Sequence, residues 1–362
     1  MKVSLFDTKI KDNDKLINSF KKLLANGQFV LGENLKTFEK DLSNYLNCKY
    51  VVGVNSGTDA IELSLKALGI SQGDYVITSG FTYFATIEAI YNVGAVPYIV
   101  DIDLNTLQID FKSIDEEILN KAKFIIPVHL FGGHVDIKEL LKLSKEYKLK
   151  IVEDVAQSFG TKYKKKHLGT FGHAGAFSFY PTKTLGSIGD AGAVATNNKA
   201  VYENLLMLRN HGHIDRDNFK FAARNSRLDE IQAIYLTHRL KNIDEEIKKR
   251  ILIANTYMND LKNIKNITFF NSEIQTFNYF PIAVESLKER DSLIKYLNSN
   301  NIDTAVYYRK PLSDLNFKWI KKSKNFKNIN YIKDRILCLP LYPNLSNRGL
   351  KYSINKIKSF YE

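Results

Sequence analysis

The sequence has few of the features that mark a secreted, membrane-spanning or metal-binding protein. Its two cysteines, Cys48 and Cys338, form neither a disulfide framework nor a metal-ligand pattern in 362 residues. No apolar run approaches the length that crosses a membrane, and residues 1–9 lack the apolar core of a signal peptide. We therefore expect a cytoplasmic protein that has no membrane contact and no bound metal ion.

Motifs for nucleic acid binding are also lacking, although the formal net charge is +13. Basic residues are scattered, with short runs at 162–166 and 318–327, and no recognition helix, zinc finger or stacking platform accompanies them. Net charge by itself indicates solubility and the attraction of anions, and not a nucleic acid partner. We expect no nucleic acid partner, and a surface that attracts phosphorylated small molecules.

Up to about residue 200, apolar strand candidates alternate with helical patterns. This order predicts an α/β fold whose mostly parallel sheet is covered by helices on both faces, with ligands beyond the carboxyl ends of the strands. The candidate strands are Tyr50–Val54, Tyr75–Thr78, Val96–Asp101, Phe124–His129 and Lys150–Asp154, and the clearest helices are Thr58–Leu68, Phe84–Val93 and Ile137–Tyr147.

The length of the chain suggests two domains that share one active site. A long helical pattern from Arg227 to about Lys262 is expected to cross between them. We place a large domain at residues 1–240 and a smaller C-terminal α/β domain at residues 241–362. The smaller domain is expected to contain strands at Tyr279–Val284 and Thr304–Tyr308 and a helix near Arg290–Asn298.

Lys183 is the most informative single residue. It follows the apolar stretch Ala174–Ser178 by five positions and precedes glycine, so a strand end delivers it into a turn. A lysine in a partly dry pocket loses its proton easily and becomes an amine nucleophile that forms a Schiff base with an aldehyde. Most lysines beside strands are solvated surface groups, so this reading depends on other motifs.

One such motif joins a strand to a helix at Val54–Ala60. Backbone N–H groups, the close approach that Gly57 permits, and the neighbouring hydroxyl of Thr58 would make a phosphate cradle. The segment is neither Gly-x-Gly-x-x-Gly nor a Walker loop, so a dinucleotide or nucleoside triphosphate is not favoured. An ordinary helix capped by Ser56 or Thr58 is the alternative.

Two further strand ends carry candidate ligands for a flat, charged ring. Tyr83 could stack on a heteroaromatic ring, although core packing is the usual role of such aromatics. Glu153 and Asp154 follow a buried strand, where a carboxylate is costly unless it is paired with a cation such as a protonated pyridine nitrogen. Metal binding is the competing interpretation, but no histidine or cysteine cluster stands beside these acids.

Together these motifs resemble those of the DegT/DnrJ family of nucleotide-sugar aminotransferases, which depend on pyridoxal 5′-phosphate (PLP). The resemblance extends over most of the chain and includes seven segments: Gly27–Gly32, Asn55–Ala60, Phe81–Thr86, Val152–Gln157, Phe177–Gly186, Leu208–Gly212 and Asn225–Glu230. It implies the aspartate-aminotransferase fold (fold type I), with a large PLP domain and a smaller C-terminal domain.

The resemblance also implies roles for individual residues. Lys183 matches the lysine that binds PLP covalently and then shuttles the proton, and Asp154 matches the partner of the pyridine nitrogen. The remaining matches are Gln157 at the ring hydroxyl, Tyr83 on the ring face, and Gly57, Thr58 and Ser178 at the phosphate. Asn225 matches an asparagine that reaches the phosphate of the neighbouring subunit, which implies a homodimer. A helix N-cap is the alternative for Asn225.

The implied reaction moves an amino group from L-glutamate to a nucleoside-diphosphate keto-sugar. Aminated sugars of this kind enter surface glycans such as lipopolysaccharide O-antigen, or glycosylated products. The Phe-Tyr-Pro-Thr-Lys183 form is most similar to enzymes that act at sugar carbon 3, on dTDP-3-keto-6-deoxyhexoses or on UDP-linked 3-keto sugars; a carbon-4 enzyme is an alternative. Tyr308 keeps the tyrosine of a frequent His-Tyr-Pro run, whereas Tyr307 and Arg309 depart from it, so substrate contacts here do not carry over.

Two other activities compete with this one. Related sugar dehydratases replace the lysine with histidine, so Lys183 argues against that branch. A catalytically silent regulatory relative would have no need for Lys183, Asp154 and Ser178 together.

Overall fold

The computed structural model describes residues 1–9, 14–270 and 276–362. Its centre is an eight-stranded sheet in the order β1-β9-β8-β5-β4-β2-β3-β12, in which every strand except the antiparallel β9 runs in the same direction. The strands are β1 (Tyr50–Val54), β2 (Tyr75–Ser79), β3 (Val96–Val100), β4 (Phe124–Ile126), β5 (Lys150–Asp154), β8 (Ala174–Ser178), β9 (Gly192–Thr196) and β12 (Lys321–Lys322). The mostly parallel α/β sheet expected from the sequence is confirmed.

Alternating side chains of these strands feed two separate cores, one on each face of the sheet. In β4, Phe124 and Ile126 join one core while Ile125 joins the other, as the two-residue period of a strand requires. The first face is covered by α3 (Gly57–Ala67), α4 (Ala85–Asn92) and α7 (Lys199–Leu208). The second is covered by α2 (Glu33–Leu46), α5 (Glu116–Lys121), α6 (Ile137–Glu146) and α8 (Glu230–Leu240).

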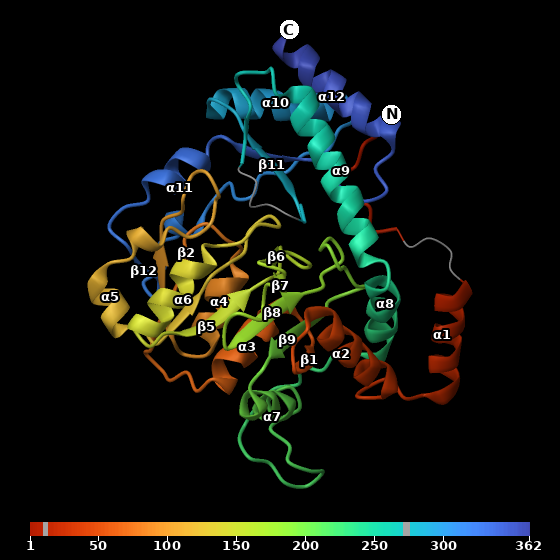
Figure 1. Ribbon diagram of the computed structural model, residues 1–362, viewed down its shortest axis with the longest axis vertical. Helices are drawn as coiled ribbons and strands as arrows, with labels where there is room; N and C mark the ends of the chain where they lie inside the picture. The colour runs from red at the N-terminus through yellow and green to blue at the C-terminus, as the bar shows by residue number, and fades with distance from the viewer. Residues whose placement is uncertain (10–13, 271–275) are drawn as a thin grey trace.

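A smaller three-stranded antiparallel sheet, in the order β10-β11-β13, lies in the upper part of Figure 1 with three long helices. Its buried side chains form a third core that also includes Val3 and Phe81, so it is continuous with the loops above the large sheet. The elements are β10 (Thr268–Phe269), β11 (Phe280–Ala283), β13 (Ile336–Leu339), α9 (Ile243–Leu261), α10 (Leu287–Ser299), α11 (Lys327–Ile332) and α12 (Asn347–Tyr361).

The long helical pattern predicted after Asn225 is two helices, because α8 ends at Leu240 and α9 begins at Ile243. Figure 1 shows α9 running between the two sheets, and its buried residues Ile247 and Tyr257 belong to different cores. We propose the domain boundary at this break, which keeps the division into residues 1–240 and 241–362. The strand expected at Thr304–Tyr308 is wrong: Ala305 makes one isolated bridge to Cys338.

Three smaller elements complete the description. The hairpin β6 (Lys162–Tyr163) and β7 (Lys166–His167) precedes β8, and α1 (Asp14–Asn26) packs on α8 at the side of the large sheet. The loop that follows α7 projects from the body of the molecule in Figure 1. Within the described residues, no helix is long and apolar enough to cross a membrane.

Candidate active site

Three of the sequence motifs meet at one edge of the large sheet. Strands β1, β5 and β8 are parallel and end at Val54, Asp154 and Ser178, so the segments that follow them emerge side by side. This is the edge at which open α/β sheets bind their ligands. The motifs therefore lie beyond the carboxyl ends of the strands, as predicted.

The first motif places a helix N-terminus beside Ser178. Helix α3 begins at Gly57, and its N-cap is Ser56, whose Oγ accepts a hydrogen bond of 3.1 Å from the N–H of Asp59. A Cβ on Gly57 would lie 2.5 Å from the Cβ of Ser178, so only glycine allows the two segments to approach this closely. Thr58, a second possible cap in the sequence, is the second residue of the helix. The positive end of the α3 dipole and the Ser178 side chain thus lie close together, an arrangement that suits an anion.

Asp154 lies 4% exposed at the end of β5. Its two carboxylate oxygens accept hydrogen bonds from the Thr86 hydroxyl at 3.0 Å and from the Ala156 N–H at 3.1 Å. Burial raises the pKa of Asp154 above its ordinary value, and these two hydrogen bonds and the charge of Lys183 act in the opposite direction. A cation placed at this carboxylate would stabilise its charged form.

Lys183 follows β8 in a turn closed by a 2.8 Å hydrogen bond from its own N–H to the carbonyl of Tyr180. Burial lowers the pKa of its amine to about 8, while the nearby charge of Asp154 raises it. An amine with this pKa is neutral in about a tenth of the molecules at pH 7, far more than a solvated lysine, and can act as a nucleophile or a base.

Glu153, the other acid of the pair, has a structural role. It is fully buried, and its carboxylate accepts hydrogen bonds of 2.7–2.9 Å from the N–H groups of Gly169, Phe171 and Gly172. It also lies 3.2 Å from Nε2 of His129. Adjacent residues of a strand point to opposite faces, so Glu153 holds the loop before β8 while Asp154 faces the site.

One hydrogen bond joins the site to the C-terminal part of the chain. Nε2 of Gln157 donates to the hydroxyl of Tyr308, 151 positions away, at 2.8 Å. Burial raises the pKa of Tyr308 well above its ordinary value, so the hydroxyl keeps its proton. The ring of Tyr83 lies 6.5 Å from that of Tyr308 and its side chain is 64% exposed, so one face is accessible to a ligand.

The segment that contains Asn225 is held beside the phosphate cradle of its own chain. Arg224 and Ser226, on either side of Asn225, bond to the two carboxylate oxygens of Asp59 in α3, each at 2.6 Å. Asn225 itself is exposed and is not the N-cap of α8, which is Asp229, so the capping alternative is wrong. An exposed asparagine on a firmly anchored segment can reach a second molecule.

The chain matches the sequence profile of the DegT/DnrJ/EryC1/StrS aminotransferase family over residues 11–358. The chain belongs to this family.

Two of the similar proteins are named for sugars that are linked to different nucleotides. The chain is 34% identical to the dTDP-3-amino-3,6-dideoxy-alpha-D-galactopyranose transaminase of Aneurinibacillus thermoaerophilus, over 94% of this chain and 93% of that protein. It is 32% identical to the UDP-2-acetamido-2-deoxy-3-oxo-D-glucuronate aminotransferase of Pseudomonas aeruginosa, over 96% and 97% of the two chains. The crystal structure of NtdA from Bacillus subtilis with bound cofactor PMP superimposes with a TM-score of 0.89 at 31% identity, over 98% of this chain and 87% of that one.

The DegT/DnrJ/EryC1/StrS proteins are PLP-dependent sugar aminotransferases, and the residues of this chain fit that cofactor. The α3 N-terminus beside Ser178 suits the phosphate, buried Asp154 suits a protonated ring nitrogen, and Lys183 supplies an amine of lowered pKa. No cluster of metal-ligating side chains competes for this place within the described parts of the chain.

Several residues of the candidate site could not be predicted from the sequence. Thr86 lies in the Phe81–Thr86 segment, which does not predict its hydrogen bond to Asp154, although a hydroxyl shortly after a strand end is a usable signal for such a bond. The bonds of Asp59 to Arg224 and Ser226 join residues at least 165 positions apart, and no local pattern predicts them.

Proposed function

We propose that this protein transfers an amino group from L-glutamate to carbon 3 of a dTDP-3-keto-6-deoxyhexose. The observation that carries the aminotransferase part is the pairing of an amine of lowered pKa at Lys183 with a buried carboxylate at Asp154, beside an anion-binding helix terminus. The carbon-3 and dTDP assignments are supported by the 34% identity to the dTDP-3-amino-3,6-dideoxy-alpha-D-galactopyranose transaminase.

In this proposal the residues act together on one bound cofactor. PLP, when bound, supplies an electron sink that makes a proton on the substrate carbon removable. The α3 N-terminus, Thr58 and Ser178 bind the phosphate, and Asp154, fixed by Thr86, keeps the ring nitrogen protonated. Lys183 accepts the proton from the substrate carbon through its neutral amine and then returns it, which a pKa of about 8 permits.

In this proposal Gln157 and Tyr308 form a further part of the site. Their 2.8 Å hydrogen bond fixes both side chains, and we propose that Gln157 contacts the ring hydroxyl of the cofactor while Tyr308 contacts substrate. The exposed ring of Tyr83 is proposed to stack on the cofactor.

We further propose that the working protein is a cytoplasmic homodimer. The anchored and exposed Asn225 supports this, because an exposed side chain on a fixed segment is free to contact a second subunit. Both cysteines are unpaired in the structure, in keeping with a reducing compartment. Its product would enter a surface glycan such as O-antigen, or a glycosylated natural product.

The test is to incubate holoenzyme and L-glutamate with dTDP- and UDP-linked keto-sugars that carry the ketone at carbon 3 or carbon 4. Product masses identify the nucleotide, and NMR identifies the aminated carbon. We expect the dTDP-linked 3-keto sugar to give the highest kcat/KM. A higher value for a UDP-linked substrate would transfer the assignment to the class of the Pseudomonas relative. A dehydrated product, or no amination of any sugar, would contradict the proposal.

A further inference from the structure

A short segment of the C-terminal part of the chain, Thr276–Tyr279, lies against the loop that carries Lys183. All four of its residues are buried, with exposed fractions of 1–8%. The segment directly precedes β11 in the small sheet, whereas Lys183 follows β8 in the large sheet. Contacts between the segment and the loop therefore join the two sheets next to the reactive amine.

The segment is itself fixed by contacts that do not involve Lys183. The hydroxyls of Thr276 and Thr161 lie 3.1 Å apart and share a hydrogen bond. Gly132 is so close that a Cβ on it would lie 2.5 Å from the N atom of Phe277, and its φ of +99° favours glycine. Nη1 of the buried Arg250 donates to the carbonyl of Phe277 at 3.2 Å. The segment therefore has one defined position beside the loops of the large sheet.

Asn278 holds the backbone next to Lys183. Its Oδ1 accepts hydrogen bonds from the N–H of Thr184 at 2.9 Å and from the Thr184 hydroxyl at 3.3 Å. The N–H of Thr184 belongs to the peptide unit that begins with the carbonyl of Lys183, and the N–H of Lys183 is bonded to Tyr180. Both peptide units that flank the lysine are thus held, which restricts the position of its Cα.

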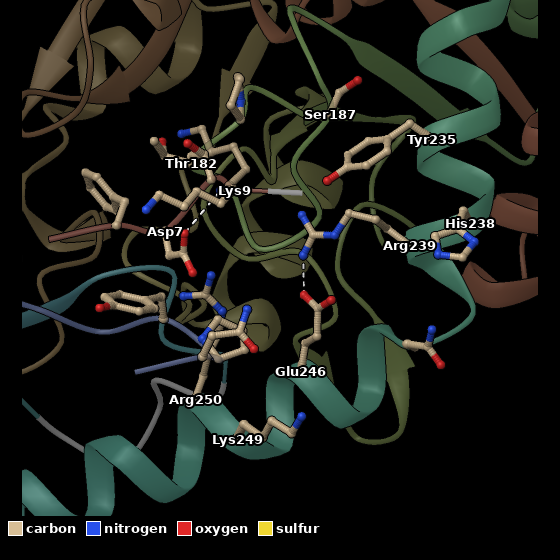
Figure 2. A pocket seen from close by; sticks show the side chains of 18 of the residues that line it. Asp7, Lys9, Thr182, Ser187, Tyr235, His238, Arg239, Glu246, Lys249 and Arg250 are labelled. Carbon is tan, nitrogen blue, oxygen red and sulfur yellow. Dashed lines mark hydrogen bonds and ion pairs between the residues drawn. The ribbon is translucent and has the colours of Figure 1, made fainter. Parts of the chain in front are cut away.

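The rest of the loop is held from α8. Arg239 donates to the carbonyls of Thr184 at 3.3 Å and Gly186 at 3.0 Å. It also forms an ion pair with Glu246 of α9, which balances its charge (Figure 2). The charged group that acts on the Lys183 amine is Asp154, which raises the pKa of that amine.

Tyr279 lies at the other end of the lysine side chain. Nζ of Lys183 is over the Tyr279 ring, 6.0 Å from its centroid, which is the outer limit of a cation–π contact. That ring packs against three others whose centroids are 4.5–6.2 Å away, those of Phe6, Phe131 and Tyr307. Burial raises the pKa of Tyr279, so its hydroxyl keeps its proton. A fixed, neutral ring attracts the charged amine and limits where it can lie.

We infer that this segment positions Lys183 for its reaction, because Asn278 fixes the backbone and Tyr279 the amine. Both are positioning residues, since each acts through the lysine and neither is assigned a contact with substrate or PLP. The inference rests on the proposed role of Lys183 and deepens it. It makes the position of the reactive amine depend on the C-terminal part of the chain, 94 positions further along from Thr184 to Asn278.

The first test measures the amine itself, without cofactor or substrate. Apoprotein that contains lysine labelled with ¹³C at Cε is titrated by NMR, and the Lys183 signal is identified by its loss in Lys183→Ala. We expect Tyr279→Leu, which removes the ring, to move the midpoint of the Lys183 titration to lower pH by about 0.5 to 1, because the ring favours the charged amine. Tyr279→Phe keeps the ring and should stay within about 0.2 of wild type. An unchanged or raised midpoint in Tyr279→Leu would overturn the inference.

The second test separates positioning from stability. Asn278→Leu removes the acceptor for Thr184. Asn328→Leu is the matched control, because Nδ2 of Asn328 donates to the carbonyl of Ile102 at 2.7 Å and so also joins the C-terminal part of the chain to the large sheet. Apoprotein is mixed with PLP at pH 7 and the growth of the yellow colour is followed, with thermal unfolding measured alongside.

We expect both asparagine variants to lose stability, but Asn278→Leu alone to capture PLP about 10-fold or more slowly, with Asn328→Leu within about threefold of wild type. Equal capture rates in the two variants, whether fast or slow, would overturn the inference. The titration of the Tyr279 variants does not depend on the folding of Asn278→Leu. A wild-type protein that does not attach PLP to Lys183 would contradict the proposed function itself.

Discussion

Helices α2 and α3 of the large domain each begin at a glycine-containing turn. The N-terminus of α2 is capped by the chain itself, whereas that of α3 is proposed to bind a ligand. Helix α2 follows Gly32, which offers no side chain as a cap. The buried carboxylate of Glu230 takes its place and accepts hydrogen bonds of 2.8–3.0 Å from the N–H groups of Gly32, Asn34 and Leu35. At α3, Ser56 satisfies the N–H of Asp59, and within the described residues no carboxylate accepts a hydrogen bond from the N–H groups at this end of the helix, since that of Asp59 is bonded to Arg224 and Ser226.

This difference shows what turns a helix N-terminus into a binding site. Both ends have positive character and unsatisfied N–H groups. At α2 the chain supplies its own anion, so the terminus is closed and contributes to stability. At α3 the space is kept for an external anion by Gly57 and Ser178. We therefore expect changes at α3 to affect cofactor binding and changes at α2 to affect folding.

The largest effect should come from removing the group that we propose holds the cofactor next to α3. Lys183→Ala takes away the amine that is proposed to bind PLP and move the proton, so we expect covalent attachment to disappear and turnover to fall by a factor of about 10⁴ or more. Borohydride reduction followed by mass spectrometry, together with steady-state rates, checks this. Lys9→Ala is the control, since it removes an exposed lysine.

The next largest effect should come from Gly57→Ala, which adds a methyl group at the N-terminus of α3. A Cβ added by Gly57→Ala would lie 2.5 Å from that of Ser178, so the cradle must open and lose hydrogen bonds to the phosphate. We expect PLP affinity to fall by about 2–3 kcal/mol, or roughly 30- to 150-fold. Equilibrium titration of apoprotein with PLP measures it, and wild-type affinity in this variant would show that the phosphate binds elsewhere.

A change at the N-terminus of α2 should lower the stability of the fold and leave PLP affinity nearly unchanged. Glu230→Gln replaces one accepting oxygen by an NH₂ group that faces backbone donors, and we expect the free energy of unfolding to fall by about 2–3 kcal/mol. The control Glu33→Gln changes an exposed side chain at the start of α2 and should lower the free energy of unfolding by less than about 1 kcal/mol. PLP affinity of Glu230→Gln within about threefold of wild type would support the comparison, and a loss as large as that of Gly57→Ala would break it.

The smallest predicted effect is a dependence on pH. The amine of Lys183 has a pKa of about 8, lowered by burial, so its nucleophilic neutral form increases as the pH rises through 8. The rate at which apoprotein captures PLP should therefore rise up to about pH 8 and then level off. A rate that continues to rise toward the ordinary lysine pKa of about 10.4 would indicate a solvated amine.

Much of this arrangement could be predicted because it is local. Strands β1 and β5 begin and end at the predicted residues, and Ser56 caps α3 as one of the two candidates proposed for it. Lys183 and Asp154 belong to short motifs at strand ends, where spacing and residue type carry the information.

The parts that were missed depend on distant partners. Glu230 closes α2 across 198 positions, and nothing near Gly32 indicates that its cap comes from there. Arg250 has the charge of an ordinary surface residue, and only the packing of α9 against the C-terminal segments buries it. At residues 304–308 the expected strand is reduced to one bridge from Ala305 to Cys338, and the hydroxyl of Tyr308 accepts a hydrogen bond from Gln157, 151 positions away.

The central claim is that Lys183, beside the open terminus of α3, holds PLP in an aminotransferase. The most direct measurement is to reduce the yellow holoenzyme with borohydride, digest it and map the phosphopyridoxyl group by mass spectrometry, with and without prior addition of L-glutamate. We expect the label on Lys183 in untreated protein and its loss after L-glutamate. A label on another lysine, or labelling of Lys183 that L-glutamate leaves unchanged, would contradict the account.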